Sequence, residues 1–328
     1  MSTASLFSVP LDRPMISFEL YPPRTPKGEA SLQRTVGELA AASPDFFSIT
    51  YGASGSTRAT SRELIRRILA ETEVTPIAHL TCVGASEEDL GEVVGDLLDG
   101  GVRDFLALRG DPPEGQPDWR PHPNGLSRAS ELVELLRRIE AQRFGTDHRS
   151  DRRSPLSISV AAYPGGRHDV TGQPVVGVND VAALLAKQEA GADFAITQLF
   201  FDVGNYTELV ERARDAGVHI PILPGVIPLT DPSRLQRLSG LTGVPVPTDL
   251  LAHLESADTE AERYRRGLRA SVDLLREVLD AGAPGLHVYT FNSSRAALDL
   301  LDGAGLRGAG ARARASLDSP TIGKVDHV

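Results

Sequence analysis

The sequence has almost no cysteine, since Cys82 is the only one among 328 residues. A single cysteine forms no intramolecular disulfide and supplies no cysteine cluster for zinc. The chain must therefore be stabilised by burial of apolar groups, and we expect a reducing, cytoplasmic location. Cys82 ends an apolar run and has no neighbouring histidine or asparagine, which favours a structural role over a nucleophilic one.

The sequence also lacks an excess of positive charge and any long apolar run. Lysine and arginine total 34 against 44 aspartate and glutamate residues, giving a formal net charge of −10. Such a surface repels nucleic acid and anionic lipid, so we expect neither nucleic acid nor a membrane as a partner. No segment approaches the roughly 18 apolar residues of a membrane span, and the N-terminus does not resemble a signal peptide. We expect no bound metal, because neither H-E-x-x-H nor facial-triad spacing occurs.

Short apolar runs alternate with segments of helical periodicity along most of the chain. The eight runs cover residues 15–20, 46–51, 76–82, 104–109, 156–162, 194–200, 219–225 and 285–291. The helical segments cover residues 29–41, 60–71, 86–99, 127–142, 178–190, 205–216, 231–241, 258–281 and 293–303. Eight alternating units predict an α/β fold, a single (β/α)8 TIM barrel. A doubly wound sheet is the alternative, but the first unit lacks the G-x-G-x-x-G of a dinucleotide-binding sheet.

The chain is longer than the roughly 250 residues of a typical TIM barrel, so some segments must lie outside the eight units. We expect an N-terminal extension over residues 1–13, a catalytic barrel over residues 14–307 and a flexible C-terminal tail over residues 308–328. The arginine-rich stretch 143–155 indicates a polar insertion within the barrel.

Carboxylates stand at the ends of two predicted strands, where a TIM barrel builds its active site. Glu19 lies between Phe18 and Leu20. Partial burial there would raise the pKa of Glu19 and suit it to act as a general acid. The alternative is a structural carboxylate bonded to a neighbouring strand. Asp111 follows an Arg-Gly step, which is also common in simple turns.

Neutral polar groups at other strand ends are further candidates. His79 would be either a site residue or a histidine satisfied within the core. Gln198 carries an amide that both donates and accepts, which suits the edge of a heterocycle, although a buried amide bonded to the main chain is the alternative. The small residues at 52–56 could cradle phosphate through their N–H groups, but such loops are also ordinary connections.

Taken in barrel order, these segments resemble the methylenetetrahydrofolate reductase family, specifically its bacterial catalytic barrel. The resemblance covers about residues 15–303. Its motifs are residues 18–19 with 22–25, 50–53, 79–82, 107–111, 161–164, 195–198, 224–225 and 287–292, the last reading HVYTFN.

The resemblance implies reduction of 5,10-methylenetetrahydrofolate to 5-methyltetrahydrofolate by NADH or NADPH. It also implies that the hydride passes through bound FAD in a ping-pong scheme, and that the product supplies methyl groups for methionine synthesis. Glu19 would protonate the nitrogen that departs when the imidazolidine ring opens, and Asp111 would favour the iminium cation near flavin and pterin. Since relatives assemble as homo-oligomers, the same is expected here.

The resemblance also implies which residues contact ligands. Arg109 and Lys187 would balance the diphosphate of FAD. The expected cofactor contacts are Thr50, Tyr51, His79, Leu108, Arg109, Gly110, Asp111, Arg128, Ala129, Tyr163, His168, Asp180 and Lys187. The expected substrate contacts are Glu19, Gln198, Leu238 and Tyr289.

Some positions depart from the family pattern. Ser293 stands where the family has an arginine, so that only Arg295 could supply this cation by reaching back. Ala183 and Ala186 replace polar side chains that contact the flavin in the family. Two alternatives therefore stay open: a flavin-independent relative that passes hydride directly from NAD(P)H to the folate, and a non-catalytic folate-binding subunit.

Overall fold

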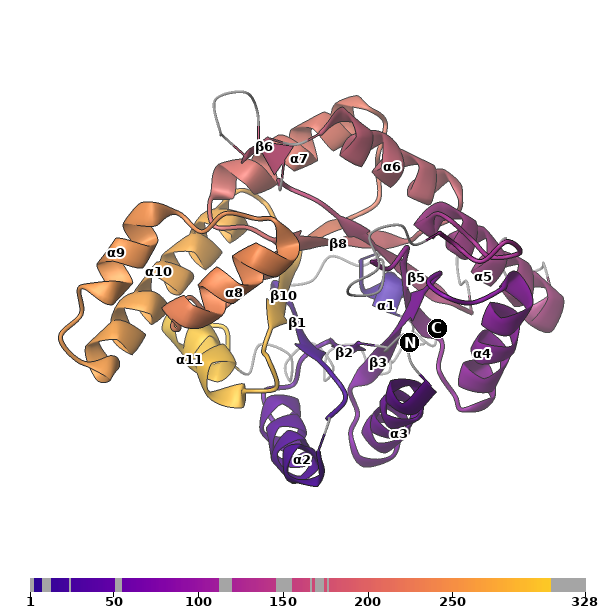
Figure 1. The fold of residues 1–328 in the computed structure, drawn as a ribbon, viewed down its shortest axis with the longest axis horizontal. Helices are drawn as coiled ribbons and strands as arrows, with labels where there is room; N and C mark the ends of the chain where they lie inside the picture. Colours follow the sequence, from indigo (N-terminus) through magenta and orange to yellow (C-terminus); the bar gives the residue numbers. More distant parts are fainter. Residues whose placement is uncertain are drawn as a thin grey trace, which may run out of the picture.

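The computed structural model describes residues 3–7, 13–23, 25–50, 55–111, 120–145, 155–165, 167–168, 174–175 and 177–307. Eight parallel strands close into a barrel in the order β1-β10-β9-β8-β5-β4-β3-β2, and helices surround it (Figure 1). The strands are β1 (Met15–Leu20), β2 (Phe46–Ile49), β3 (Thr75–Thr81), β4 (Asp104–Leu108), β5 (Ser157–Ala162), β8 (Phe194–Leu199), β9 (Ile222–Val226) and β10 (Gly285–Tyr289). The predicted (β/α)8 barrel is confirmed, because each of the eight runs overlaps one strand of it.

The main helices also follow the predicted segments. They are α2 (Pro26–Ala40), α3 (Gly55–Glu71), α4 (Glu87–Asp99), α5 (Ala129–Phe144), α6 (Val178–Glu189), α7 (Val203–Asp215), α8 (Pro232–Thr242), α9 (Thr248–Glu255), α10 (Glu260–Asp280) and α11 (Ser294–Ala304). The sequence analysis missed α9, whose eight residues contain too few turns to show a period. It also missed the short antiparallel pair β6 (Arg167–His168) and β7 (Pro174–Val175). None of the described helices is long and apolar enough to cross a membrane.

Local hydrogen bonds explain where several helices begin. Thr25 caps α2 by accepting the N–H of Gly28 at 3.1 Å, and Pro26 takes the first helical position, where its missing N–H costs nothing. Ser86 and Asp89 form a reciprocal capping box at the start of α4, with bonds of 3.1 and 2.9 Å. These short-range signals fix the helix boundaries before tertiary packing is considered.

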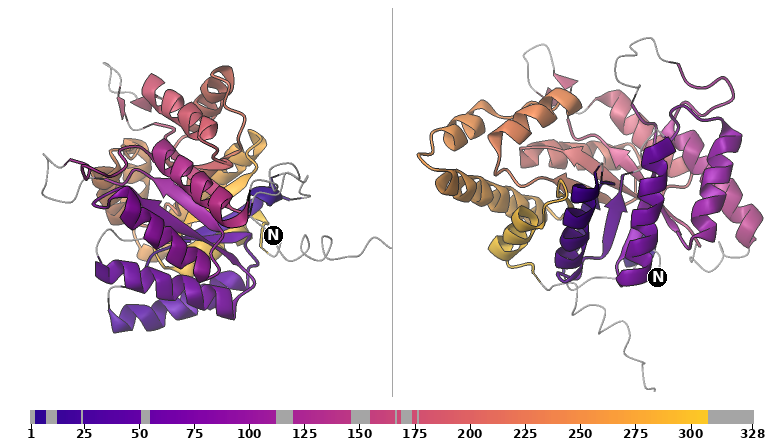
Figure 2. Two further views of the ribbon diagram at one scale, coloured as in Figure 1. Left: turned by 90° about the vertical axis from the view of Figure 1, so that its right-hand side faces the viewer. Right: turned by 60° about the horizontal axis from the view of Figure 1, so that its bottom comes forward.

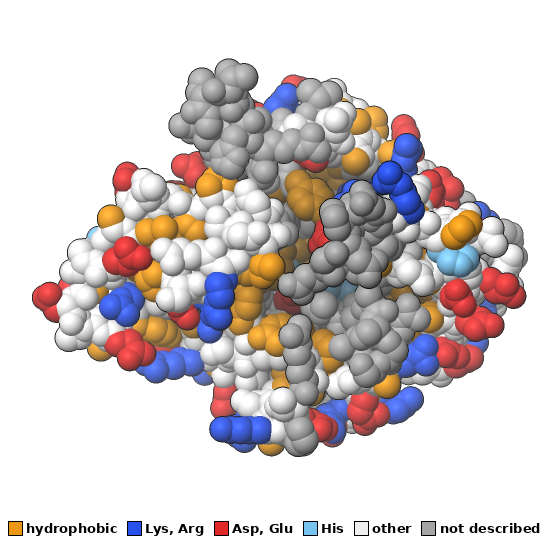
Figure 3. Space-filling view, in the orientation of Figure 1, with side chains coloured by type: hydrophobic (Ala, Val, Ile, Leu, Met, Phe, Trp, Pro, Cys, Tyr) orange, Lys and Arg blue, Asp and Glu red, His pale blue; other side chains and the backbone are white. Residues whose placement is uncertain are grey.

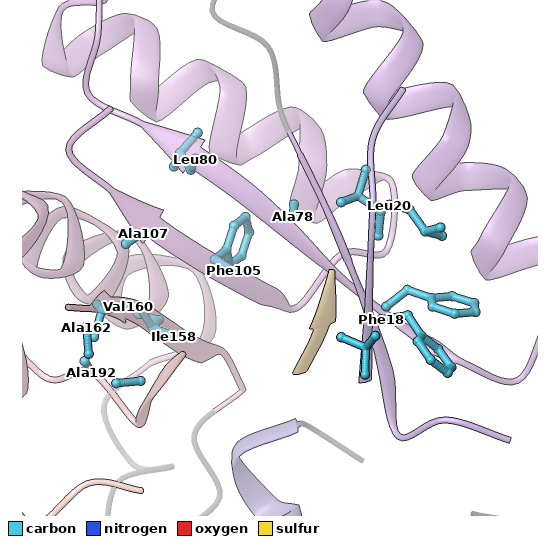
Figure 4. Close-up of a cluster of buried hydrophobic side chains, with 14 of the residues drawn as sticks. Phe18, Leu20, Ala78, Leu80, Phe105, Ala107, Ile158, Val160, Ala162 and Ala192 are labelled. Carbon is cyan, nitrogen blue, oxygen red and sulfur yellow. The ribbon is translucent and has the colours of Figure 1, made fainter. Parts of the chain in front are cut away.

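Strand residues alternate between the helices and the barrel interior. On the helix side, residues such as Phe18, Leu20, Leu80 and Phe105 belong to one large buried cluster (Figure 4). At the N-terminal end of the interior, a smaller apolar cluster contains Met15, Phe46, Ile77, Leu106, Phe194, Ile196 and Leu223. The polar inward-facing residues lie closer to the C-terminal ends of the strands, so the apolar layer forms a floor beneath them.

A short helix, α1 (Thr3–Leu6), closes the N-terminal end of the barrel (Figure 2). The Thr3 N–H donates to Asp104 Oδ1 at 2.8 Å, and the Ala4 N–H donates to Ser157 Oγ at 3.0 Å. The Phe7 ring lies 4.8 Å from the Phe194 ring, between centroids. The predicted N-terminal extension thus contains an ordered contact that the sequence analysis did not foresee. Residues 146–154 of the predicted insertion and the predicted tail at 308–328 lie outside the described residues.

The contact of α1 with Asp104 predicts a pH dependence of stability. Burial raises the pKa of Asp104 to about 6 from its ordinary value of 3.8, although the Thr3 amide and the Ser157 hydroxyl lower it. The folded chain therefore holds this proton more tightly than the unfolded chain. The resulting contribution to stability is complete below about pH 4 and is lost as the pH rises through about 6.

We predict that the free energy of unfolding of the native protein falls by about 2–3 kcal/mol between pH 4 and 7, relative to that of Asp104→Asn. Asparagine keeps an oxygen that accepts the Thr3 N–H but does not ionise. Urea unfolding of both proteins at several pH values measures the difference. Identical pH slopes for the two proteins would contradict the prediction.

Candidate active site

Glu19 lies at the C-terminal end of β1 with its side chain 25% exposed. Its Oε1 accepts the Thr50 hydroxyl at 3.4 Å, and its Oε2 lies 3.9 Å from His287 Nε2. Burial by itself raises the pKa of Glu19, but the hydrogen bond of His287, the charges of His79 and His287, and the Thr50 hydroxyl together lower it below its ordinary value. The expected upward shift is therefore wrong, because these polar neighbours outweigh burial.

His287 connects Glu19 to a buried polar chain. Its Nδ1 lies 2.8 Å from Ser17 Oγ and its Nε2 lies 3.4 Å from Ser48 Oγ. Ser48 Oγ lies 2.9 Å in turn from His79 Nε2. Burial lowers the pKa of His79 to about 4, so this imidazole is neutral at neutral pH. Hydrogen-bonding groups from four strands thus meet beneath the carboxylate.

Sequence reasoning assigned no role to His287, Ser17 or Ser48. The two-residue period indicates only that Ser17 and Glu19 share one face of their strand, and that His287 and Tyr289 share one face of theirs. The structure pairs Ser17 with His287 and Glu19 with Tyr289. This register joins the first strand to the last, 270 residues apart at the Ser17–His287 contact, and no local pattern encodes it.

Tyr289 lies beside Glu19, at the position expected for a substrate contact. Its hydroxyl donates to the Thr197 carbonyl at 2.7 Å. Burial raises the pKa of Tyr289 well above its ordinary value, and the charge of Glu19 acts in the same direction. The hydroxyl therefore stays protonated. Gly225 makes room for the ring, since a Cβ there would lie 2.3 Å from the Thr197 oxygen and 2.7 Å from Tyr289 Cε2.

Lys187, from α6, is a buried cation on the opposite side of the mouth. Its Nζ donates to the Ala161 carbonyl at 2.8 Å and lies 5.8 Å from the centre of the Tyr163 ring. Burial lowers the pKa of Lys187 to about 8; the charge of Asp180 opposes this shift, and the smaller effect of the Arg109 charge adds to it. Lys187 is thus a buried cation influenced by charges of both signs, with a main-chain carbonyl as its hydrogen-bond partner.

Asp111 lies near enough to Tyr163 to affect the pKa of the tyrosine. Burial raises the pKa of Tyr163, and the charges of Asp111 and Asp180 add to the rise while Arg109 opposes it. Tyr163 also raises the pKa of Tyr289. The structure therefore brings the predicted cofactor residues of β4, β5 and α6 to the same mouth as Glu19.

The turn after β4 has a steric reason for its glycine. Gly110 has a φ of +82°, and a Cβ there would lie 2.5 Å from Val83 Cγ2. Beside this turn, the Leu108 carbonyl accepts the Cys82 N–H at 3.3 Å. Burial raises the pKa of Cys82 to about 12, so that its thiol stays protonated and matches the structural role expected for it.

Of the remaining predicted contacts, some are described by the structure and others are not. Arg128 caps α5 and is exposed, while Ala129 begins that helix and is buried. The Gln198 amide oxygen accepts the N–H of Leu199 at 2.9 Å, and the described residues offer no partner to its amide nitrogen. Tyr51 lies outside the described residues, as do residues 52–54 of the small-residue loop. For His168 only the main chain, in β6, is described.

On the other side of the mouth, Leu238 of α8 packs with Tyr289 and Phe291 against an apolar cluster that includes Leu235. Viewed from the same direction as Figure 1, hydrophobic side chains gather near the centre of the face, with charges of both signs around its edge (Figure 3). The described residues contain no group of three or more His, Cys, Asp or Glu side chains placed to hold a metal ion.

The sequence model of the family described as "Methylenetetrahydrofolate reductase" matches residues 8–305. The chain belongs to the methylenetetrahydrofolate reductase family. It is 32% identical over 295 residues to the 5,10-methylenetetrahydrofolate reductase of Pectobacterium carotovorum subsp. carotovorum, covering 89% of this chain and 90% of the relative. It is 30% identical to the enzyme of the same name from Escherichia coli (strain K12), covering 89% of this chain and 91% of that one.

Plant members of the family are longer. The chain is 32% identical over 300 residues to the "Probable methylenetetrahydrofolate reductase (NADH)" of Oryza sativa subsp. japonica, covering 90% of this chain but 48% of the relative. The chain thus spans about half the length of the plant relatives. A solved structure from Clostridium thermocellum, described as binding two copies of 5-methyl-5,6,7,8-tetrahydrofolic acid, matches with a TM-score of 0.58 and 13% identity. It covers 92% of this chain and 96% of that one, a likeness that shows the fold alone.

Arg295 does not replace the arginine that the methylenetetrahydrofolate reductase family has at the position of Ser293. Arg295 is 78% exposed, its Nε lies 3.8 Å from Asp299 Oδ2, and its guanidinium lies 4.7 Å from the centre of the Tyr264 ring. It therefore faces α10 and does not reach back to the mouth. On the mouth side, Arg234 of α8 stacks over the Phe291 ring at 5.0 Å.

The packing of Gly225 against Tyr289 gives a direct test of this part of the site. We predict that Gly225→Ala lowers the free energy of unfolding by about 1–3 kcal/mol, because the added methyl group must displace the Thr197 backbone or the Tyr289 ring. Urea unfolding measures the change.

Gly240→Ala is the matched control, since a Cβ at this helical position meets nothing within 4 Å. It should raise stability by about 0.5–1 kcal/mol, because alanine favours a helix more than glycine does. Equal effects of the two substitutions would show that the Gly225 contact is not tight.

Proposed function

We propose that this protein reduces 5,10-methylenetetrahydrofolate to 5-methyltetrahydrofolate, with NADH or NADPH as the electron donor and FAD as the resident carrier. The observation that carries the proposal is Glu19, a half-buried carboxylate that His287 and Thr50 hold at the mouth of a barrel of this family. The family match supplies the reaction, and the site supplies a proton donor of the kind the reaction needs.

Glu19 would act as the general acid of the folate step. Opening the five-membered ring of the substrate requires a proton on the departing nitrogen. Glu19 is ionised at neutral pH in this structure, since its pKa is lowered. A bound ligand that covers the mouth removes water from the carboxylate, and desolvation raises a carboxyl pKa. Ligand binding would thus convert Glu19 from a base into a proton carrier.

Other residues would orient the substrate and balance its charge. The negative charge of Asp111 would favour the iminium cation formed as the ring opens. The amide nitrogen of Gln198, to which the described residues offer no partner, would donate a hydrogen bond to the substrate. The Tyr289 hydroxyl, whose proton goes to the Thr197 carbonyl, would accept one. Leu238 would add apolar contact from α8.

The described residues fit FAD through their charges. Lys187 is nine-tenths buried, and its side chain has a neutral partner in the Ala161 carbonyl. Arg109 lies near enough to lower its pKa. The charges of Lys187 and Arg109 would balance a diphosphate group. The further proposed contacts are Thr50, His79, Leu108, Gly110, Arg128, Ala129, Tyr163 and Asp180. When bound, FAD supplies reversible hydride chemistry.

The absorbance spectrum of the purified protein tests this proposal against the alternatives. Bound FAD gives the visible bands of a flavin and parallel-line kinetics in which donor and folate alternate. Ala183 and Ala186 lie on the exposed side of α6. They replace polar side chains that contact the flavin in the family, and this loss is the reason for considering a flavin-independent relative. Absence of flavin together with ternary-complex kinetics would favour that relative. Folate binding without any turnover would favour a non-catalytic subunit.

Replacing Glu19 separates the two halves of the proposed reaction. We predict that Glu19→Gln slows reduction of methylenetetrahydrofolate by about 10²- to 10⁴-fold, the usual range for loss of a general acid. Reduction of bound flavin by NADH or NADPH should continue at the native rate, because it needs no proton from Glu19. Stopped-flow absorbance measures both half-reactions. The control is Glu92→Gln, on the exposed face of α4. Full folate turnover in Glu19→Gln would refute the assignment.

Lys187 provides a test of cofactor binding that does not depend on turnover. We predict that Lys187→Met weakens FAD binding by about 10- to 100-fold, which corresponds to the loss of one charge-assisted hydrogen bond. Flavin fluorescence titration of the apoprotein measures the affinity. The native affinity should fall as the pH rises above about 8, where Lys187 loses its charge, and Lys187→Met should lack this fall. Lys27→Met, at an exposed lysine of α2, is the control. Equal affinities of the two variants would argue against the diphosphate contact.

A further inference from the structure

The ladder between β1 and β10 continues beyond its last backbone pair through side chains. The final register pair is Glu19 with Tyr289. The next residue, Thr290, donates its hydroxyl to the Glu19 carbonyl at 2.6 Å. Asn292 then uses both ends of its carboxamide on Tyr21: Oδ1 accepts the Tyr21 N–H at 3.0 Å, and Nδ2 donates to the Tyr21 carbonyl at 2.8 Å. The amide of Asn292 thus takes the place of a peptide group from a longer strand.

This arrangement depends on an unusual turn after β10. Phe291 and Asn292 have φ values of 52° and 55°, both in the left-handed region. Asparagine is among the few side chains that tolerate this region, whereas phenylalanine does not favour it. Backbone strain of this kind persists only where surrounding contacts enforce it, and it is concentrated at functional sites.

Several contacts enforce the turn. The Tyr21 hydroxyl donates to the Phe291 carbonyl at 2.9 Å, and Arg234 covers the Phe291 ring at 5.0 Å. From α2, the Thr35 hydroxyl donates to the Asn292 carbonyl at 3.2 Å. The strained turn is therefore fixed from β1, α2 and α8 together.

The turn holds the backbone on the C-terminal side of the Glu19 carboxylate. Thr290 binds the Glu19 carbonyl, and Asn292 binds both backbone groups of Tyr21, two residues further on. The carboxylate itself has only long contacts, 3.4 Å to Thr50 and 3.9 Å to His287. A small rotation of the strand end would break these contacts, so the carboxylate depends on the backbone for its direction.

We propose that Asn292 is a positioning residue that aims the Glu19 carboxylate into the mouth of the barrel. The proposal rests on the function proposed above, in which Glu19 is the general acid. The titratable groups that face Glu19 are His287 and Tyr289 of β10 and His79 of β3. In the described part of the chain none of them hydrogen-bonds to the Asn292 side chain. A change at residue 292 therefore reaches Glu19 through the backbone.

Two variants separate the carboxamide from the shape of the turn. Asn292→Gly keeps the left-handed backbone, which glycine adopts freely, but removes both bonds to Tyr21. Asn292→Asp keeps the size of the side chain but cannot donate to the Tyr21 carbonyl. Because glycine suits this backbone, Asn292→Gly should fold even if the aspartate variant does not.

For Asn292→Gly we expect the folate half-reaction to slow by about 10- to 100-fold, the effect of displacing a catalytic group by about 1 Å. Reduction of bound flavin by NADH should stay at the native rate. The apparent pKa governing the folate half-reaction should rise, because the displaced carboxylate loses contacts that lower its pKa. Hydrogen exchange should show the Tyr21 amide exchanging faster, a readout that needs neither ligand nor turnover.

Asn205→Gly, in the first turn of α7, is the matched control: glycine destabilises that helix without touching β1. It should lower stability and leave both half-reactions and the pH profile unchanged. A native folate half-reaction in Asn292→Gly would overturn the proposal, as would a parallel fall of both half-reactions. If the native protein does not reduce methylenetetrahydrofolate at all, the proposed function fails instead. The hydrogen-exchange result stands apart from this: a native exchange rate of the Tyr21 amide in Asn292→Gly would refute the proposed contact between Asn292 and Tyr21.

Discussion

The pairing of β1 with β10 is the interaction on which the site depends. It closes the barrel, and its register sets Ser17 against His287 and Glu19 against Tyr289. A shift of β1 by one residue would turn Ser17 and Glu19 towards the helices and bring Ile16 and Phe18 into the interior, because strand side chains alternate between faces. The buried apolar face of each strand therefore fixes where the acidic and imidazole groups meet.

The barrel interior combines an apolar floor with a polar layer above it. Buried polar groups destabilise a protein unless they are hydrogen-bonded, and here Ser17, Ser48, His79 and His287 satisfy one another. This chain has a direct effect on Glu19, whose pKa is lowered although burial alone would raise it. The resting state of the carboxylate is thus set by its neighbours and not by its depth.

Much of the fold was predictable because it rests on local signals. The eight strands follow from short apolar runs, and helices such as α4 follow from a capping residue and a closing glycine. The short elements were not predictable, since α1, α9, β6 and β7 contain too few residues to show a period. For α1, the deciding contact is with Asp104, 101 residues away from Thr3.

The candidate site was predictable to the extent that single residue types indicate chemistry. Glu19, Lys187 and Tyr289 were predicted to be site residues, and the structure brings all three to one mouth. The role of His287 and the direction of the Glu19 pKa shift were not foreseen, because both depend on the register between the first and last strands. The same holds for Asn292, whose significance lies in a turn that no local motif predicts.

The covered N-terminal end of the barrel limits how a ligand can reach Glu19. α1, Phe7 and Phe194 cover the N-terminal end of the described interior, opposite the strand ends that carry Glu19. A molecule that binds at Glu19 would therefore approach and leave at the C-terminal ends of the strands. Two large ligands that use the same opening would then have to bind one after the other, so the shape of the barrel would impose the order of binding.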